Sequence, residues 1–270
     1  MIRYYWNLFK RLVIISTSSM LMYRTNMLFF LLFESFFLAA NLGGLILGVN
    51  LAGGHLGGWS LNEVLFVASI FGISHQLFTT FCMGGLFSVG WFVWSGRMDY
   101  VLLKPLHPLI SQHVASEFII SNIPNLLINI GVFILFCLRL ADDGVRFSFL
   151  NILVLGVFFC AGLAVRYGIA IFVVGPAFFA EKLAEGEDAY WALQSLAKYP
   201  TGVFPRIMQW IFTFLVPIAC VAAIPAEVFF GRQSVASAAL HLSTSLFFAW
   251  SAVKFYELGA SRYQSVNSGT

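Results

Sequence analysis

The chain has 270 residues, of which 60% are hydrophobic and 10% are charged, and its formal net charge is +3. Soluble domains carry about a quarter charged residues, so fifteen basic and twelve acidic side chains cannot cover a soluble fold of this size. This composition excludes an ordinary cytosolic enzyme, a disordered chain and a nucleic-acid-binding domain. It predicts an all-α integral membrane protein with several spans.

Residues 1–20 have the pattern of an amphipathic interfacial helix. Apolar residues recur at helical spacing on one face, and a cationic face lies opposite it, which is typical of a helix lying along a membrane surface. The apolar face comprises Ile2, Tyr5, Trp6, Phe9 and Val13, and the polar face comprises Arg3, Asn7, Lys10 and Arg11. The alternative is the first part of a longer spanning helix, but the polar run 16–19 favours the surface helix.

A helix needs about 20 apolar residues to cross the hydrocarbon layer. Six stretches qualify, and they predict one transmembrane domain over 1–270 with its spans between 27 and 257 and a tail over 258–270. The predicted spans are 27–49, 63–95, 114–138, 149–180, 207–230 and 235–257. The second and fourth exceed one crossing, so they must tilt, extend or break. Pro176 is expected to end the fourth.

Lysine and arginine are retained on the cytoplasmic side of membrane proteins, and their distribution predicts that both termini are cytoplasmic. Eleven of the fifteen fall on one side of the six predicted spans: Arg3, Lys10, Arg11, Arg24, Arg97, Lys104, Lys182, Lys198, Arg206, Lys254 and Arg262. The opposite side receives Arg139, Arg146 and Arg232, and Arg166 lies within a span.

Two loops have distinct compositions. The first external loop, 48–62, is rich in glycine, and Ser60 and Glu63 at its end fit a capping box that starts the second span, with Trp59 and Val64 as the flanking hydrophobic pair. The cytoplasmic segment 181–206 is the most polar stretch of the chain. We expect it to form a short solvated helix.

Ionisable side chains inside a bilayer are costly, which makes Glu34 in the first span and Arg166 in the fourth candidates for a hydrated substrate path. They could also neutralise one another, Arg166 could pair with a backbone carbonyl, and Glu34 could reach the interface.

The third span has a polar stripe on one helix face. Such a stripe must face protein or water, because lipid offers no hydrogen-bond partner to polar side chains. The stripe comprises Glu117, Ser121, Asn122, Asn125 and Asn129. Hydrogen bonding between helices and lining of a translocation cavity both explain it. Pro124 is expected to kink this helix in its middle.

Motifs of soluble catalysis are missing from the sequence. The glycine cluster 53–58 lacks the Gly-Lys-Ser/Thr ending of a phosphate-binding loop, the five histidines are scattered, and neither a metal-ligand spacing nor a nucleophile motif is present. A membrane-embedded lipid-modifying enzyme using Glu34, His75 or Glu117 remains an alternative. So do a proton-coupled secondary transporter with Glu34 as carrier, and a scaffold that transports nothing.

Three segments together resemble the permease subunits of ABC exporters of the ABC-2 type. Residues 96–109 read GRMDYVLLKPLHPL, similar to the family's Gly-x-x-Asp-x-x-Leu-x-x-Pro-x-x-Pro-Leu segment. Tyr199-Pro200 is followed by Phe204-Pro205. The third segment runs from Pro217 through Pro225 to Gly231. Their order and spacing extend the resemblance over nearly the whole chain.

The resemblance implies an exporter subunit in the cell inner membrane that works with a separate ATPase and a second permease chain, as a homodimer or heterodimer. ATP and magnesium would be bound by the partner, and this chain would need no cofactor. The resemblance also implies a cytoplasmic coupling helix with Arg97, Asp99, Lys104 and Pro105, and outer re-entrant helices between spans five and six, which Pro217, Pro225 and Glu227 fit. An amphipathic, lipidic or cationic drug-like substrate is expected.

Overall fold

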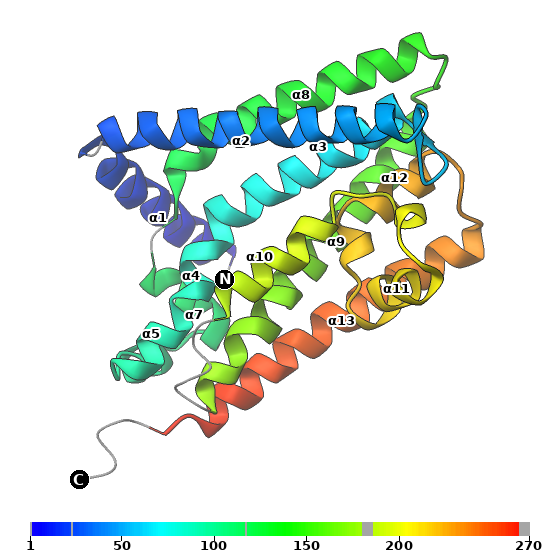
Figure 1. Cartoon of the computed structure of the whole chain (residues 1–270). Helices are drawn as coiled ribbons and strands as arrows, with labels where there is room; N and C mark the ends of the chain where they lie inside the picture. The colour runs from blue at the N-terminus through cyan, green and yellow to red at the C-terminus, as the bar shows by residue number, and fades with distance from the viewer. Residues whose placement is uncertain (1, 23, 117, 180–185, 265–270) are drawn as a thin grey trace.

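The computed structural model describes residues 2–22, 24–116, 118–179 and 186–264. They form a bundle of helices with one small β-hairpin (Figure 1). The α-helices are α1 (Ile2–Met22), α2 (Arg24–Leu51), α3 (Leu61–Phe78), α4 (Gly84–Phe87), α5 (Val89–Trp94), α6 (Met98–Leu102), α7 (Pro108–Ala115), α8 (Ile123–Asp142), α9 (Phe149–Val174), α10 (Glu187–Leu196), α11 (Arg206–Trp210), α12 (Ala223–Phe229) and α13 (Val235–Arg262).

Short helical turns join or extend these helices. Two are π-helical, η1 (Thr79–Met83) and η6 (Ile211–Leu215). The others are 3-10 turns: η2 (Ile120–Asn122), η3 (Gly175–Phe178), η5 (Thr201–Val203) and η7 (Ile218–Val221). The hairpin strands are β1 (His55–Leu56) and β2 (Trp59–Ser60), with His55 opposite Ser60 and Leu56 opposite Trp59.

Five helical stretches in the described part of the chain are long and apolar enough to cross a membrane: Met27–Leu51, Leu61–Trp94, Ile120–Asp142, Phe149–Phe178 and Val235–Arg262. They coincide with five of the six predicted spans. The long second stretch contains the π-helical turn η1, and Ser88 separates α4 from α5. The stretch is therefore interrupted, which is one of the three outcomes expected from its length. The fourth changes from α-helix to the 3-10 turn η3 just before Pro176, as proline predicts.

The predicted fifth span, 207–230, is wrong as a single crossing helix. The chain there forms α11 and η6, leaves helical geometry at Val216 (φ −123°, ψ 85°), and then forms η7 and α12. Pro217 causes the break, because a residue before proline is pushed towards extended geometry. Because this stretch is almost uniformly apolar, its hydropathy does not indicate the interruption.

The third span begins later than predicted. Helix α7 ends at Ala115, and the spanning stretch starts only with the 3-10 turn η2 at Ile120, which leads into α8. Pro124 lies in the first turn of α8 and not at a kink in the middle of the helix. In the first turn, the missing N–H of proline costs nothing, because that position has no intrahelical acceptor. Glu117 lies outside the described residues.

Segment 181–206 was expected to form a short solvated helix, and its described part forms the short helix α10, which is exposed on one face but packed on the other. Helix α10 packs against α9, with Tyr190 and Gln194 buried. The next turn, η5, reaches the β-hairpin, where Gly202 and Gly57 approach so closely that neither has room for a side chain. Lys198 and Arg206 therefore lie towards the hairpin and not with the other predicted cytoplasmic cations. Residues Glu181, Lys182 and Glu185 are outside the described part.

The β-hairpin defines one end of the bundle, called here the hairpin end. Gly57 and Gly58 have positive φ values of 59° and 82°, the geometry that two-residue hairpin turns require. The predicted capping box is confirmed, since the Ser60 N–H donates to the Glu63 carboxylate at 2.8 Å. Arg232 stacks over Trp59 at 4.0 Å and pairs with Glu63 at 2.5 Å, which ties the start of α13 to the hairpin.

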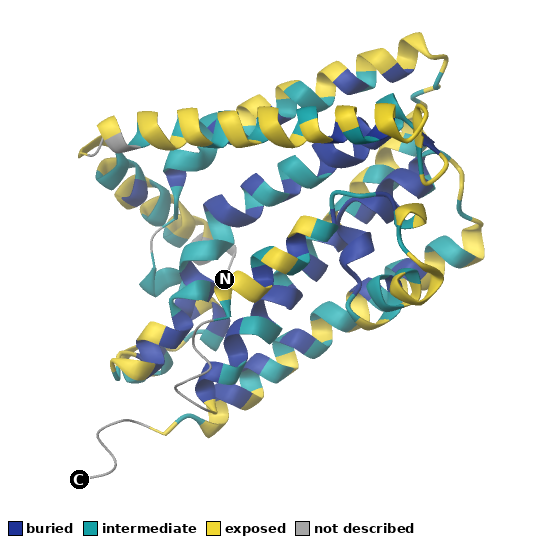
Figure 2. Cartoon of the chain, viewed as in Figure 1, coloured by how far each residue is buried: buried dark blue, intermediate teal, exposed yellow. Residues whose placement is uncertain are grey.

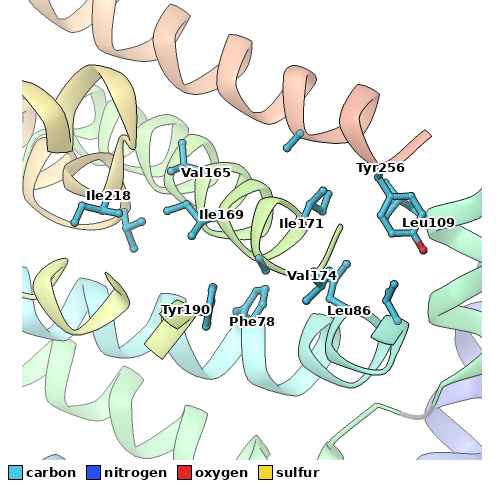
Figure 3. Packing of buried hydrophobic residues seen from close by; sticks show 14 of the residues in the cluster. Phe78, Leu86, Leu109, Val165, Ile169, Ile171, Val174, Tyr190, Ile218 and Tyr256 are labelled. Atoms are coloured by element: carbon cyan, nitrogen blue, oxygen red, sulfur yellow. The ribbon is translucent and has the colours of Figure 1, made fainter. Parts of the chain in front are cut away.

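Helix α9 is the centre of the bundle. It packs against α13, α12, η7, α3 and α10, and Figure 2 shows buried residues concentrated along it while α2 is largely exposed. Figure 3 shows Val165, Ile169 and Ile171 of α9 among side chains from α3, α10 and α13. Lipid is as apolar as these side chains, so close packing rather than water exclusion must hold spanning helices together.

Small residues on α9 permit this close packing. At Gly162 a Cβ atom would lie 2.4 Å from the carbonyl oxygen of Cys220, which belongs to η7. Gly168 and Gly175 face Phe248 and Phe255 of α13 in the same manner. Glycine at these places lets the broken segment and α13 approach the α9 backbone.

We predict that Gly162→Ala destabilises the protein by about 1–3 kcal/mol, since the clash is with backbone and cannot be relieved by a side-chain rotation. The measurement is the melting temperature of the purified protein in detergent. Gly156→Ala on the same helix is the control, because no atom lies within 4 Å of the added Cβ. Equal melting temperatures for the two variants would contradict the close approach.

Candidate functional site

A groove lies between α2 and α10, with α3 as its floor. Its volume is about 680 Å³, within the range of ligand sites in proteins. The wall from α2 is mostly apolar, with Phe33, Phe37, Leu38, Leu42 and Leu45. The polar residues that line the groove are Glu34, Asn41, His75, Gln76, Thr79, Asn129, Gln194, Ser195 and Lys198.

Two hydrogen bonds cross the groove. The Gln76 amide of α3 donates to the Glu34 carboxylate at 3.2 Å, and the Lys198 ammonium donates to the side-chain oxygen of Asn41. Glu34 and Asn41 are seven residues apart on α2, about 10 Å along the helix. The groove therefore has a carboxylate near one end and an ammonium near the other.

The structure brings only part of the predicted substrate path together. Glu34 and Asn129 line the groove. Asn125 is buried, and its carbonyl accepts a hydrogen bond from the Asn129 amide at 2.9 Å. Asn122 lies in η2, before α8 begins. The predicted stripe is thus divided, because the helix does not extend back far enough to align all of its members.

Arg166 is fully buried behind the groove. Its guanidinium carbon lies 4.8 Å from the centre of the Phe71 ring, and His75 and Tyr190 are close enough to interact with its charge. None of its three nitrogens has a hydrogen-bond partner at good geometry among the described residues. Arg166 and Glu34 do not form an ion pair in the described part of the chain, so the structure does not support the alternative in which they neutralise one another.

Sequence reasoning missed the contribution of α10. Trp191, Gln194 and Lys198 recur at intervals of three and four residues and line the groove together, as residues on one helix face do. This periodicity was present in the sequence. The periodicity is hard to recognise, because the charged residues around it favour a solvated cytoplasmic helix.

The residues of the predicted re-entrant region lie near the hairpin end. Pro217 marks the break, and Pro225 is in the first turn of α12, where proline is tolerated. Glu227 is buried and accepts hydrogen bonds from Thr201 and from Gln233. Its carboxylate therefore joins the loop after α10 to the loop before α13.

The predicted coupling residues surround α6, at the end of the bundle opposite the hairpin end. Arg97 stacks over Trp91 at 4.4 Å and Lys104 over Tyr100 at 4.9 Å. Partial burial lowers the pKa of the Lys104 ammonium. Asp99 is half-buried and Pro105 is exposed.

Helix α6 has one buried face and one exposed face. Met98 and Val101 are fully buried, whereas Tyr100 and Leu103 are 67% and 82% exposed. The chain then turns into α7, where His107 bonds to Glu257 of α13 at 2.9 Å. The apolar surface of α6, flanked by Arg97 and Lys104, is thus connected to α13 through His107 and to the second long stretch through α5.

The sequence matches a family model described as ABC-2 family transporter protein over residues 36–267. Comparisons with curated proteins and with solved structures give no match. The matched range contains α6, the broken segment and almost all of the groove.

We predict that Glu227→Ala lowers stability by about 1–3 kcal/mol, because it leaves the Thr201 hydroxyl and the Gln233 amide without their acceptor. Thermal unfolding in detergent measures this loss. Asp188→Ala, which removes an exposed carboxylate from α10, is the control and is expected to melt like the unchanged protein. A Glu227 variant with unchanged melting would show that its carboxylate does not hold the two loops.

Proposed function

Because the chain belongs to the ABC-2 family of transporter membrane proteins, we propose that it is the permease subunit of an ATP-driven exporter. The family is generally associated with an ATPase partner, and its membrane subunits typically lack catalytic activity. The exporter would move an amphipathic, lipidic or cationic drug-like substrate out of the cell through the inner membrane. A second permease chain, identical or different, would complete it.

The observation that carries this proposal is the groove between α2 and α10. It combines polar side chains with an apolar wall at the level of long apolar helices, and polar groups at membrane depth are retained where they face protein, water or a ligand. Glu34 and Asn129 would contact the substrate directly. Arg166 would act from behind the wall, while Asn122 and Asn125 would support α8.

Coupling to the ATPase is assigned to the surface of α6. Its exposed Tyr100 and Leu103 offer an apolar contact, and Arg97 and Lys104 offer charge. Since His107 bonds to α13 and α5 leads directly into α6, movement of this surface would be transmitted to two long helices. Nucleotide binding on the partner would thereby shift the population between inward- and outward-facing states.

A sixth crossing is assigned to α10 and the residues that follow it, in place of 207–230. The chain runs from the end of η3, through α10 along the groove, to η5 beside the hairpin (Figure 1). The broken segment from α11 to α12 then becomes the re-entrant pair on the outer side. Six crossings place both termini on the cytoplasmic side, which the bias of lysine and arginine supports.

We predict that Leu103→Glu abolishes ATPase association and that Asp99→Ala and Lys104→Ala reduce substrate-stimulated ATP hydrolysis, because these changes alter the docking surface. The measurements are co-purification in mild detergent and ATPase activity of the reconstituted complex. Arg139→Ala, at the hairpin end of α8, is the control and should change neither. If no ATPase co-purifies with the unchanged chain, or if all three α6 variants behave like it, the coupling assignment is wrong.

The sixth crossing predicts opposite accessibility for the two ends of α10. In a variant without the four native cysteines, Val203→Cys should react with a membrane-impermeant thiol reagent applied from outside. Asp188→Cys should react only after the membrane is permeabilised. His55→Cys in the hairpin is the reference for the outer side. Reaction of both test positions from the same side would contradict the crossing.

A further inference from the structure

The wall of the groove beneath α10 contains an unusual concentration of buried polar atoms. Among the described residues, Nδ1 of His75 and both amide atoms of Gln194, which line the groove, have no hydrogen-bond partner. Behind them, the Tyr190 hydroxyl and the Arg166 guanidinium interact with one another but have no hydrogen bond of good geometry. These groups come from α3, α9 and α10. Buried polar groups without partners cost about 1–3 kcal/mol each, so a cluster of them indicates a site completed by something else.

The charge of this cluster specifies what completes it. Arg166 is fully buried, and no carboxylate of the described chain forms an ion pair with it. The groove residues contributed by α10 and the turn after it include a second cation, Lys198, and no acid. A buried arginine is normally paired with an anion, and its planar fork suits the two oxygens of a phosphate or carboxylate.

The one acid in the groove lies on its other side. Gln76, which holds the Glu34 carboxylate, is one residue after His75 on α3 and so points about 100° away from it. Glu34 therefore belongs to the α2 side, and Arg166 lies behind the α10 side. An anion beside His75 and Gln194 would face both cations without meeting Glu34 directly.

The rest of the groove suits an apolar tail. Its α2 wall is formed by phenylalanine and leucine side chains, and the neighbouring part of α2 is exposed, with Phe29, Phe33 and Phe36 61–69% exposed. We infer that the groove binds an anionic amphiphile. Its oxyanion head group moves the unbonded Gln194 amide and the His75 ring aside and contacts Arg166. Its tail lies against α2.

This inference deepens the proposed function, because it names the ligand class of the same groove. It also gives Arg166, which the sequence suggested for a substrate path, the specific role of contacting the anionic head group. A structural role for Arg166 as a cation stacked on Phe71 is the competing explanation. That role predicts no preference among ligand head groups.

The test is calorimetric binding to the purified full chain in an uncharged maltoside detergent, with protein-free micelles as reference. The probes share one tail and differ in charge: dodecyl phosphate, dodecylphosphocholine and dodecyltrimethylammonium. Inorganic phosphate distinguishes a free anion from an amphiphile. We expect dodecyl phosphate to bind most tightly and inorganic phosphate at least about tenfold more weakly, since it lacks the tail contacts.

Variants then locate the site. Arg166→Met should weaken dodecyl phosphate binding by at least about tenfold, Arg166→Lys less, and Arg139→Met, which removes an exposed arginine of α8, not at all. Ser195→Phe fills the groove from an exposed position without disturbing the buried cluster, so it should abolish binding even if the Arg166 variants do not fold.

Three results would overturn the inference: tighter binding of the cationic probe, equal binding of inorganic phosphate and dodecyl phosphate, or unchanged binding in a folded Arg166→Met or Ser195→Phe protein. The experiment needs neither nucleotide nor ATPase. Its failure would leave coupling at α6 untouched, and a failure of coupling would leave binding untouched.

Discussion

The close approach between α9 and its neighbours is the constraint on which the other features depend. A glycine at position 162 lets the backbone of η7 lie against α9, and glycines 168 and 175 leave room for the Phe248 and Phe255 rings of α13. In a bilayer, such contacts replace the water exclusion that stabilises soluble cores. Helices α3 and α10 also pack against α9, and the groove lies between these two helices and α2.

The broken segment from α11 to α12 fits the same constraint. Its irregular backbone at Val216 and Pro217 would be costly if it faced lipid, because unpaired peptide groups have no partners there. Contact of η7 and α12 with α9, together with the buried carboxylate of Glu227, which joins the loops on both sides, keeps the part of this segment from Pro217 onward inside protein. The end of the bundle that carries the hairpin is thereby closed by Thr201, Gln233 and the Arg232–Glu63 pair.

The two ends of the bundle are built for different purposes. The hairpin end is tied by the Arg232–Glu63 ion pair, by stacking and by close glycine contacts, whereas the opposite end presents α6 with exposed Tyr100 and Leu103. Between them, the groove has an apolar wall from a weakly buried α2 and a polar wall backed by a buried arginine. In the function proposed above, these three features would serve as the surface that contacts the ATPase, the ligand site and the outer end.

From the sequence alone we could predict the membrane class, five of the long apolar helices, the capping box at Ser60 and the family, but not the hairpin. Each of these depends on local composition or on residues a few positions apart. Gln194 and Lys198 could not be assigned to a groove backed by Arg166 in the same manner, because these residues come together only when α10 packs against α9. Tertiary structure also decided that 207–230 is broken and that one face of α10 is buried. Hydropathy averages over a window and cannot register a break at one proline, and it treats a polar helix as solvated unless its packing partners are known.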